Sequence, residues 1–147
     1  MRASSLMDLT TGLIDNRVFS GDMHDREQRN VFGTCWLFLG LDSLIARPGD
    51  YFTTYMGEDP VIVQRDAAGK IRVYLNRCRH RGAELCIFDS GNARSFTCSY
   101  HGWTYADGAL VGVPHRRDAY RNEIDLSTHG LFEAPKVSVY GGLIFAC

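Results

Sequence analysis

Four side chains that bind transition metals fall into two short groups in the middle of the sequence. Cys78 and His80 form a C-x-H group, and Cys98 and His101 form a C-x2-H group after seventeen intervening residues. Each group offers one thiolate and one imidazole, and a glycine follows closely. Two thiolates and two imidazoles are enough to complete a metal site. The spacing therefore predicts a metal centre enclosed between two loops.

Two kinds of centre use these ligands. Structural zinc takes two cysteines and two histidines, commonly with the like ligands on the same arm. Here each arm is mixed, so two parallel loops place cysteine beside cysteine and histidine beside histidine. This favours a two-iron, two-sulfide centre in which two histidines replace two cysteines on one iron, the Rieske arrangement. A structural zinc module stays as an alternative.

The ligand set also predicts the redox behaviour of a two-iron centre. Two ferric ions, two sulfides and two thiolates sum to zero charge, whereas four thiolates would leave the centre anionic. An electron enters a neutral centre more easily, so the reduction potential is expected within roughly −150 to +300 mV.

Composition limits the other function classes. The chain has 147 residues, of which 45% are hydrophobic and 22% charged, with a formal net charge of −1. This is typical of one globular domain and gives no electrostatic reason to expect a nucleic-acid partner. No apolar run is long enough to span a membrane, and the N-terminus does not read as a secretory signal. We therefore expect a cytoplasmic protein, in which five cysteines are not a disulfide framework.

The elements that must position the ligands read as short strands. A helix is expected over residues 22–31, with Asp22 as its N-cap. After it, short apolar or alternating runs separated by turns predict an all-β, antiparallel fold. The expected strands cover residues 36–39, 51–56, 61–64, 71–75, 96–97, 103–105, 109–111, 136–140 and 143–146.

The residues around the ligands, together with runs elsewhere in the chain, resemble a known protein family. The sequence resembles the α subunit of bacterial aromatic-ring-hydroxylating dioxygenases. Four runs carry the resemblance: residues 55–61 (YMGEDPV), 77–82 (RCRHRG), 91–93 (GNA) and 96–103 (FTCSYHGW). The likeness is greatest to the naphthalene, biphenyl and salicylate types. High-potential Rieske proteins carry an extra disulfide in these loops, but Ala83 and Tyr100 occupy the corresponding places here.

This resemblance implies an organisation for the chain. Residues 1–33 would be an approach segment with a short helix, and residues 34–147 a Rieske [2Fe-2S] domain of antiparallel sheets with its cluster-binding subdomain at about 76–114. It implies one [2Fe-2S] cluster on Cys78, His80, Cys98 and His101. The family's C-terminal catalytic domain holds a mononuclear non-haem Fe(II), whose histidines stand five positions apart. His24, His115 and His129 offer no such pair, so that domain is expected to be absent from this chain.

The resemblance also implies partners, and the residues beside the ligands suggest supporting roles. Electrons would come from a ferredoxin or reductase, and neighbouring α subunits of a trimer and a β subunit would complete the enzyme. Near the cluster, Arg81 would offset negative charge, Tyr100 would hydrogen-bond near a cysteine sulfur, and Trp103 would cover the site; a solvated arginine and two core aromatics are the plain alternatives. A free-standing Rieske ferredoxin is the other candidate function.

Overall fold

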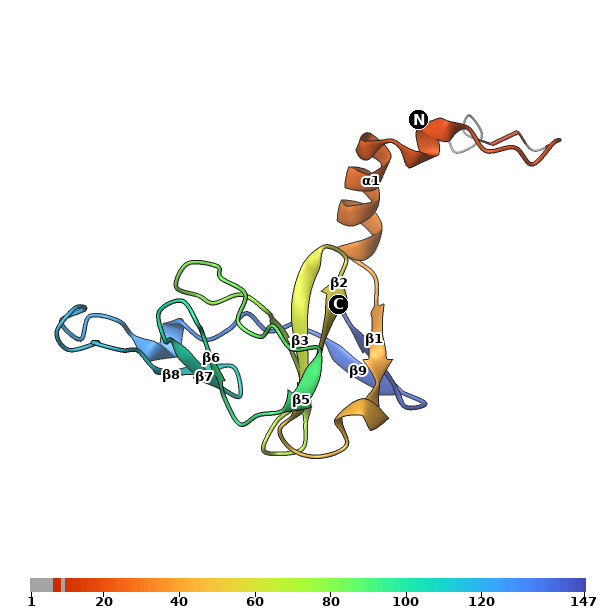
Figure 1. The fold of residues 1–147 in the computed structure, drawn as a ribbon. Coiled ribbons are helices and arrows are strands. Elements are labelled where there is room, and N and C mark those ends of the chain that lie inside the picture. The colour runs from red at the N-terminus through yellow and green to blue at the C-terminus, as the bar shows by residue number, and fades with distance from the viewer. Residues whose placement is uncertain (1–6, 9) are drawn as a thin grey trace. The chain divides into compact units, whose positions relative to one another are not determined.

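The computed structural model describes residues 7, 8 and 10–147, which divide into two compact units, one up to Cys35 and the other from Trp36 to Cys147. The first unit carries a 3-10 helix, η2 (Asn16–Phe19), the α-helix α1 (Gly21–Glu27) and a π-helical turn, η3 (Gln28–Phe32) (Figure 1). The expected helix is therefore present, but its N-cap is Ser20, whose hydroxyl accepts from the Met23 N–H, so Asp22 as the cap is wrong. Among the described residues, no helix combines the length and apolar character needed to cross a membrane.

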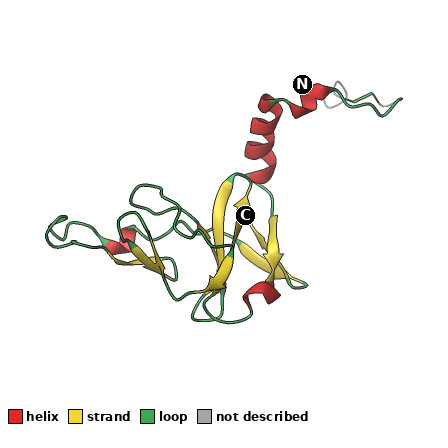
Figure 2. Ribbon diagram, viewed as in Figure 1, coloured by secondary structure: helices red, strands yellow, loops and turns green. Residues whose placement is uncertain are grey.

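The second unit is built from three antiparallel sheets (Figure 2). The four-stranded sheet has the order β4-β3-β2-β5, and the two three-stranded sheets have the orders β1-β10-β9 and β6-β7-β8. The strands are β1 (Leu37–Leu41), β2 (Asp50–Met56), β3 (Asp59–Arg65), β4 (Ile71–Leu75), β5 (Ser90–Asn92), β6 (Phe96–Thr97), β7 (Thr104–Ala106), β8 (Ala109–Gly112), β9 (Val137–Tyr140) and β10 (Leu143–Ala146). The all-β, antiparallel prediction is confirmed.

The central strand β3 explains how the three sheets pack. Successive side chains of a strand point to opposite faces. Val61 and Val63 join a core with Ile144 of β10, whereas Ile62 joins a second core with Tyr105 of β7. The four-stranded sheet is thus covered on both faces, which is why β3 reads as a continuous apolar run rather than an alternation.

Two details depart from the strand predictions. Asp59 and Pro60, expected in a turn, begin β3, and Pro60 pairs with Tyr55. The edge strand β5 was not predicted, because a Ser-Gly-Asn run has low strand propensity. Its place is set by pairing, since Gly91 lies opposite Tyr51 of β2.

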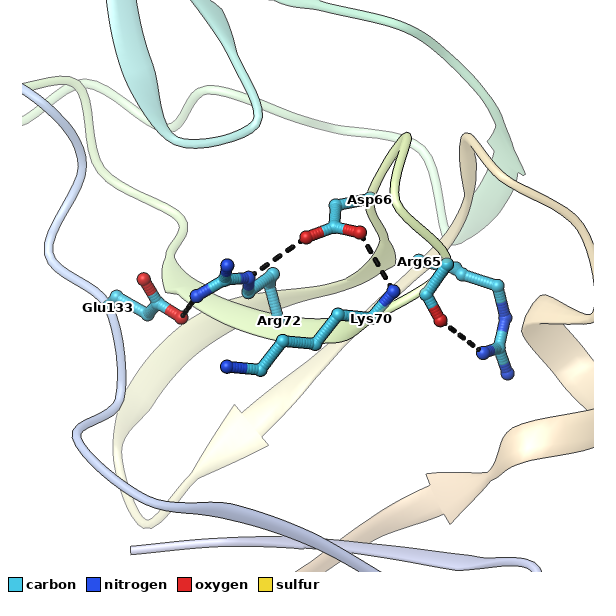
Figure 3. A network of polar contacts seen from close by, with 6 residues as sticks. Arg65, Asp66, Lys70, Arg72 and Glu133 are labelled. Atoms are coloured by element: carbon cyan, nitrogen blue, oxygen red, sulfur yellow. Dashed lines mark hydrogen bonds and ion pairs between the residues drawn. The ribbon is translucent and has the colours of Figure 1, made fainter.

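A polar network closes the β3–β4 hairpin (Figure 3). The carboxylate of Asp66 accepts from the Lys70 N–H at 2.8 Å and from Arg72 Nε at 3.0 Å. Arg72 also forms an ion pair with Glu133 at 2.9 Å. The hairpin turn and the segment that leads into β9 are therefore joined by paired charges.

Candidate metal centre

Two loops carry the four predicted ligands, one between β4 and β5 of the four-stranded sheet and one between β6 and β7 of the β6-β7-β8 sheet. In the first loop, the Cys78 N–H donates to the Ala83 carbonyl and the Gly82 N–H to the Cys78 carbonyl, both at 2.8 Å. In the second loop, the Cys98 N–H donates to the Trp103 carbonyl and the Gly102 N–H to the Cys98 carbonyl, again at 2.8 Å. The two loops thus share one backbone pattern, in which the cysteine N–H donates to the carbonyl five residues later and the cysteine carbonyl accepts from the glycine four residues later.

Glycine makes both turns possible. Gly82 has a φ of 71° and Gly102 a φ of 73°, values in the left-handed region that side chains with a Cβ resist. At Gly102 a Cβ would also lie 2.7 Å from a ring carbon of Pro114. These backbone conformations explain why a glycine follows each ligand pair.

The loops bring like ligands together in pairs. The rings of His80 and His101 are neighbours, with centroids 4.6 Å apart and planes at 77°. Cys78 and Cys98 are free thiols, 3% and 2% exposed, in the same core cluster, and Cys98 is close enough to contribute to the raised pKa of Cys78. Over the described part of the chain, no group of three or more His, Cys, Asp or Glu side chains is arranged around one metal position.

The pKa shifts of His80 and Cys78 bear on how these side chains would bind a metal. Burial, together with the positive forms of His101 and Arg81, lowers the pKa of His80 and so favours its neutral imidazole. Burial raises the pKa of the Cys78 thiol, so a metal must displace its proton on binding. Nδ1 of His80 is buried and has no hydrogen-bond partner among the described residues. A buried lone pair without a donor is chemically suited to a metal ion.

Tyr105, rather than the predicted Tyr100, lies against a cysteine sulfur. The Tyr105 hydroxyl is 3.4 Å from Cys78 Sγ and accepts the Arg79 N–H at 3.1 Å. Because burial raises the pKa of Tyr105, the hydroxyl keeps its proton and can donate it to the sulfur. Tyr100 is 61% exposed, and its ring lies on His101 with centroids 3.8 Å apart.

Trp103 and the arginines surround the same centre. The indole of Trp103 is 3% exposed and stacks on His80 at 4.7 Å and 9°. Arg81 is exposed but close enough to act on the pKa of His80. Arg79 lies with its guanidinium 3.8 Å above the Phe132 ring.

Comparison with known protein families then decides what kind of centre this is. The family model of the Rieske [2Fe-2S] domain matches residues 35–130, more than half of the chain. The chain belongs to the Rieske [2Fe-2S] family. Its cofactor is a [2Fe-2S] cluster, so this membership favours the two-iron centre over the zinc alternative.

Individual Rieske proteins extend the likeness beyond the domain. The chain is 46% identical over 145 residues to the biphenyl 2,3-dioxygenase subunit alpha of Rhodococcus jostii (strain RHA1), covering 97% of this chain and 31% of that protein. It is 46% identical over 144 residues to the benzene 1,2-dioxygenase subunit alpha of Pseudomonas putida, covering 97% and 32%. The structure of naphthalene 1,2-dioxygenase from Rhodococcus sp. bound to indole matches with a TM-score of 0.85 and 44% identity, covering 90% of this chain and 31% of that one. The chain thus spans about a third of the length of the relatives it matches.

Proposed function

We propose that this chain is the electron-transfer domain of an aromatic-ring-hydroxylating dioxygenase α subunit. The observation that carries the proposal is the pair of matched loops, which presents two buried thiols and two adjacent imidazoles. The similarity to dioxygenase α subunits over 97% of the chain supports the same conclusion. When bound, a Rieske cluster accepts and releases one electron at a time, at a potential within roughly −150 to +300 mV.

The ligand assignment follows the pairs in the structure. Cys78 and Cys98 would hold one iron through their sulfurs, and His80 and His101 the other through ring nitrogens. Nδ1 of His80 is buried and has no hydrogen-bond partner in the described part of the chain, and it is the coordinating atom that we assign to this ring. The fit is chemical as well as spatial, because thiolate and neutral imidazole are the ligands that this centre takes.

The surrounding residues would control charge and water at the centre. Tyr105 would donate a hydrogen bond to the Cys78 sulfur once that sulfur is a thiolate ligand, and Trp103 would keep water from one face of His80. Arg81 supplies positive charge near the same histidine. The hydrogen bond and the positive charge would stabilise the reduced cluster, which is more negative, and the indole would exclude solvent from it.

The rest of the enzyme is inferred from the family. A further catalytic domain would carry a mononuclear Fe(II) on two histidines and a carboxylate, a geometry with open positions for oxygen. Residues 34–147 would take electrons from a ferredoxin or reductase and pass them to that iron, within an assembly of neighbouring α subunits and a β subunit. Residues 1–33 would be the segment that precedes the domain.

The test uses the purified chain. We expect two irons and two acid-labile sulfides per chain, reduction by NADH through a reductase, and no hydroxylated product from any of a panel of aromatic acids and hydrocarbons. Replacing Cys98 or His101 by alanine should abolish the cluster, whereas Cys147→Ala, at a cysteine outside the two loops, should leave it intact. Zinc without sulfide would refute the cluster, and stoichiometric product would place a catalytic centre in this chain.

A further inference from the structure

Among the residues that the structure describes, two buried polar atoms beside the ligand loops have no hydrogen-bond partner and lie on rings that stack on one another. One is Nδ1 of His80, and the other is Nε1 of Trp103. An indole N–H can only donate a hydrogen bond, and buried donors in native proteins are nearly always paired. An N–H that lacks a protein acceptor therefore points to a group beyond the protein atoms.

The geometry of the stack relates the two atoms. The rings of Trp103 and His80 are 4.7 Å apart between centroids and 9° from parallel. Nδ1 and Nε1–H each lie in the plane of their own ring, so the two atoms lie in adjacent, nearly parallel planes. Both unpartnered atoms thus belong to one stack of rings, which makes a group bound at Nδ1 of His80 a candidate acceptor for the Nε1–H of Trp103.

Other rings hold the indole in this position. His129 meets Trp103 edge-on, with centroids 5.9 Å apart and planes at 73°. The His129 ring is itself fixed, since its Nδ1 lies 2.8 Å from the Asp125 carbonyl and 3.0 Å from the Thr128 hydroxyl. Tyr120 closes another side, 6.5 Å from Trp103. This enclosure leaves Trp103 only 3% exposed.

We propose that Trp103 donates its Nε1–H to a sulfur atom of the cluster that is bound by the two loops. This inference rests on the proposed ligand assignment. Hydrogen bonds to the sulfurs of an iron–sulfur cluster help to set its reduction potential. A donor at this point stabilises the extra negative charge of the reduced state, so Trp103 raises the potential. In this role Trp103 contacts the cofactor directly, in addition to packing on His80.

The rival acceptor is a buried water molecule. A water needs two to four polar partners and room for its own volume. The neighbours of Trp103 named above are aromatic rings, and the polar atoms of His129 named here already engage Asp125 and Thr128. These surroundings favour the cluster sulfur, and the two acceptors give different spectroscopic results.

The first experiment leaves the site unaltered. The chain has only two tryptophans, and the other one, Trp36, is 50% exposed in a different part of the second unit. A Trp36→Phe chain labelled with indole-¹⁵N tryptophan therefore reports on Trp103 alone. Pulsed electron paramagnetic resonance of its reduced cluster should detect the indole nitrogen and a proton that disappears after exchange into D2O. Absence of both couplings would overturn the proposal, and a buried water would then be the acceptor of the indole N–H.

The second experiment removes the donor while the shape of the side chain is kept. Trp103 is replaced by benzothienylalanine, which has sulfur in place of the N–H, and separately by phenylalanine. Both variants should have a lower midpoint potential than Trp36→Phe and should lack the exchangeable coupling. An unchanged potential in the benzothienyl variant would refute the role. Iron and sulfide are measured first: if the unaltered chain binds no cluster, the proposed function fails, whereas an intact cluster without these effects refutes this inference alone.

Discussion

The sheet scaffold and the cluster-binding part of the second unit satisfy their polar groups in different ways. At the β3–β4 hairpin of the scaffold, the buried carboxylate of Asp66 is bonded to Arg72 and to the Lys70 backbone (Figure 3). In the cluster-binding part, His80 Nδ1, Trp103 Nε1 and Arg79 Nε are buried without a hydrogen-bond partner in the described chain. In the described chain, three of the four buried polar atoms without a partner therefore lie beside the ligand loops, where a cofactor would bind, and only one, Gln64 Oε1, lies in the scaffold.

The sheet scaffold also has more regular secondary structure than the cluster-binding part. β2 and β3 pair over six residues each, and Val63 and Ile144 in the core between the sheets are fully buried. β6 has only two residues, and long loops carry the ligands. We therefore expect the cluster to contribute folding free energy mainly to its own part.

Loss of the cluster should produce the largest effect. In Cys98→Ala, the loops around residues 76–86 and 98–103 should lose their protection from hydrogen exchange, because the bond between them is gone. The β2–β3–β4 sheet should stay protected, since its core and pairing are untouched. Mass-spectrometric hydrogen exchange measures both regions in one sample, with Cys147→Ala as the control. Equal loss of protection in the two regions would contradict the contrast.

Breaking the Asp66 network should have an intermediate effect, confined to the scaffold. Burial raises the pKa of Asp66, but hydrogen bonds from Arg72 and the Lys70 N–H outweigh it and lower the pKa below the ordinary value. Asp66→Asn should cost about 1–3 kcal/mol in the free energy of unfolding. The exposed Asp118→Asn is the matched control.

The pH dependence of that cost has a definite sign. A depressed folded-state pKa gives stability that is complete above the unfolded value of about 3.9 and is lost as the pH falls through the folded value. The difference between the unaltered chain and Asp66→Asn in urea unfolding should therefore be constant at pH 5–7 and shrink below about pH 4. A difference that grew on acidification would show that Asp66 is not held as a carboxylate.

The smallest expected effect lies inside the cluster-binding part. Tyr105→Phe removes the hydroxyl 3.4 Å from Cys78 Sγ, which should lower the midpoint potential while iron and sulfide content stay the same. Tyr100→Phe alters an exposed ring and should leave the potential near that of the unaltered chain. Protein-film voltammetry measures the midpoint potential of both variants. A larger change in Tyr100→Phe than in Tyr105→Phe would show that Tyr100, not Tyr105, is the tyrosine that acts on the cysteine sulfur.

The sequence predicted the ligand loops because their residue types and glycines are local signals. Tyr105 carried a signal too: Trp103 and Tyr105 are two residues apart in a strand-like run, so both face the same core. The sequence could not identify His129 as a neighbour of Trp103. That contact joins the residue before β7 to a residue more than twenty positions away, and no periodicity predicts it. β5 was missed for the same reason, because pairing with β2 rather than propensity creates it.

The central claim is that cysteines and histidines meet as like pairs on two different irons. Mössbauer spectroscopy of the ⁵⁷Fe-loaded, oxidised chain tests it most directly, because each iron reports its own ligands. We predict two quadrupole doublets of equal area with different isomer shifts, one from the thiolate-bound iron and one from the imidazole-bound iron. A single doublet from two equivalent irons would contradict the pairing of Cys78 with Cys98 and of His80 with His101.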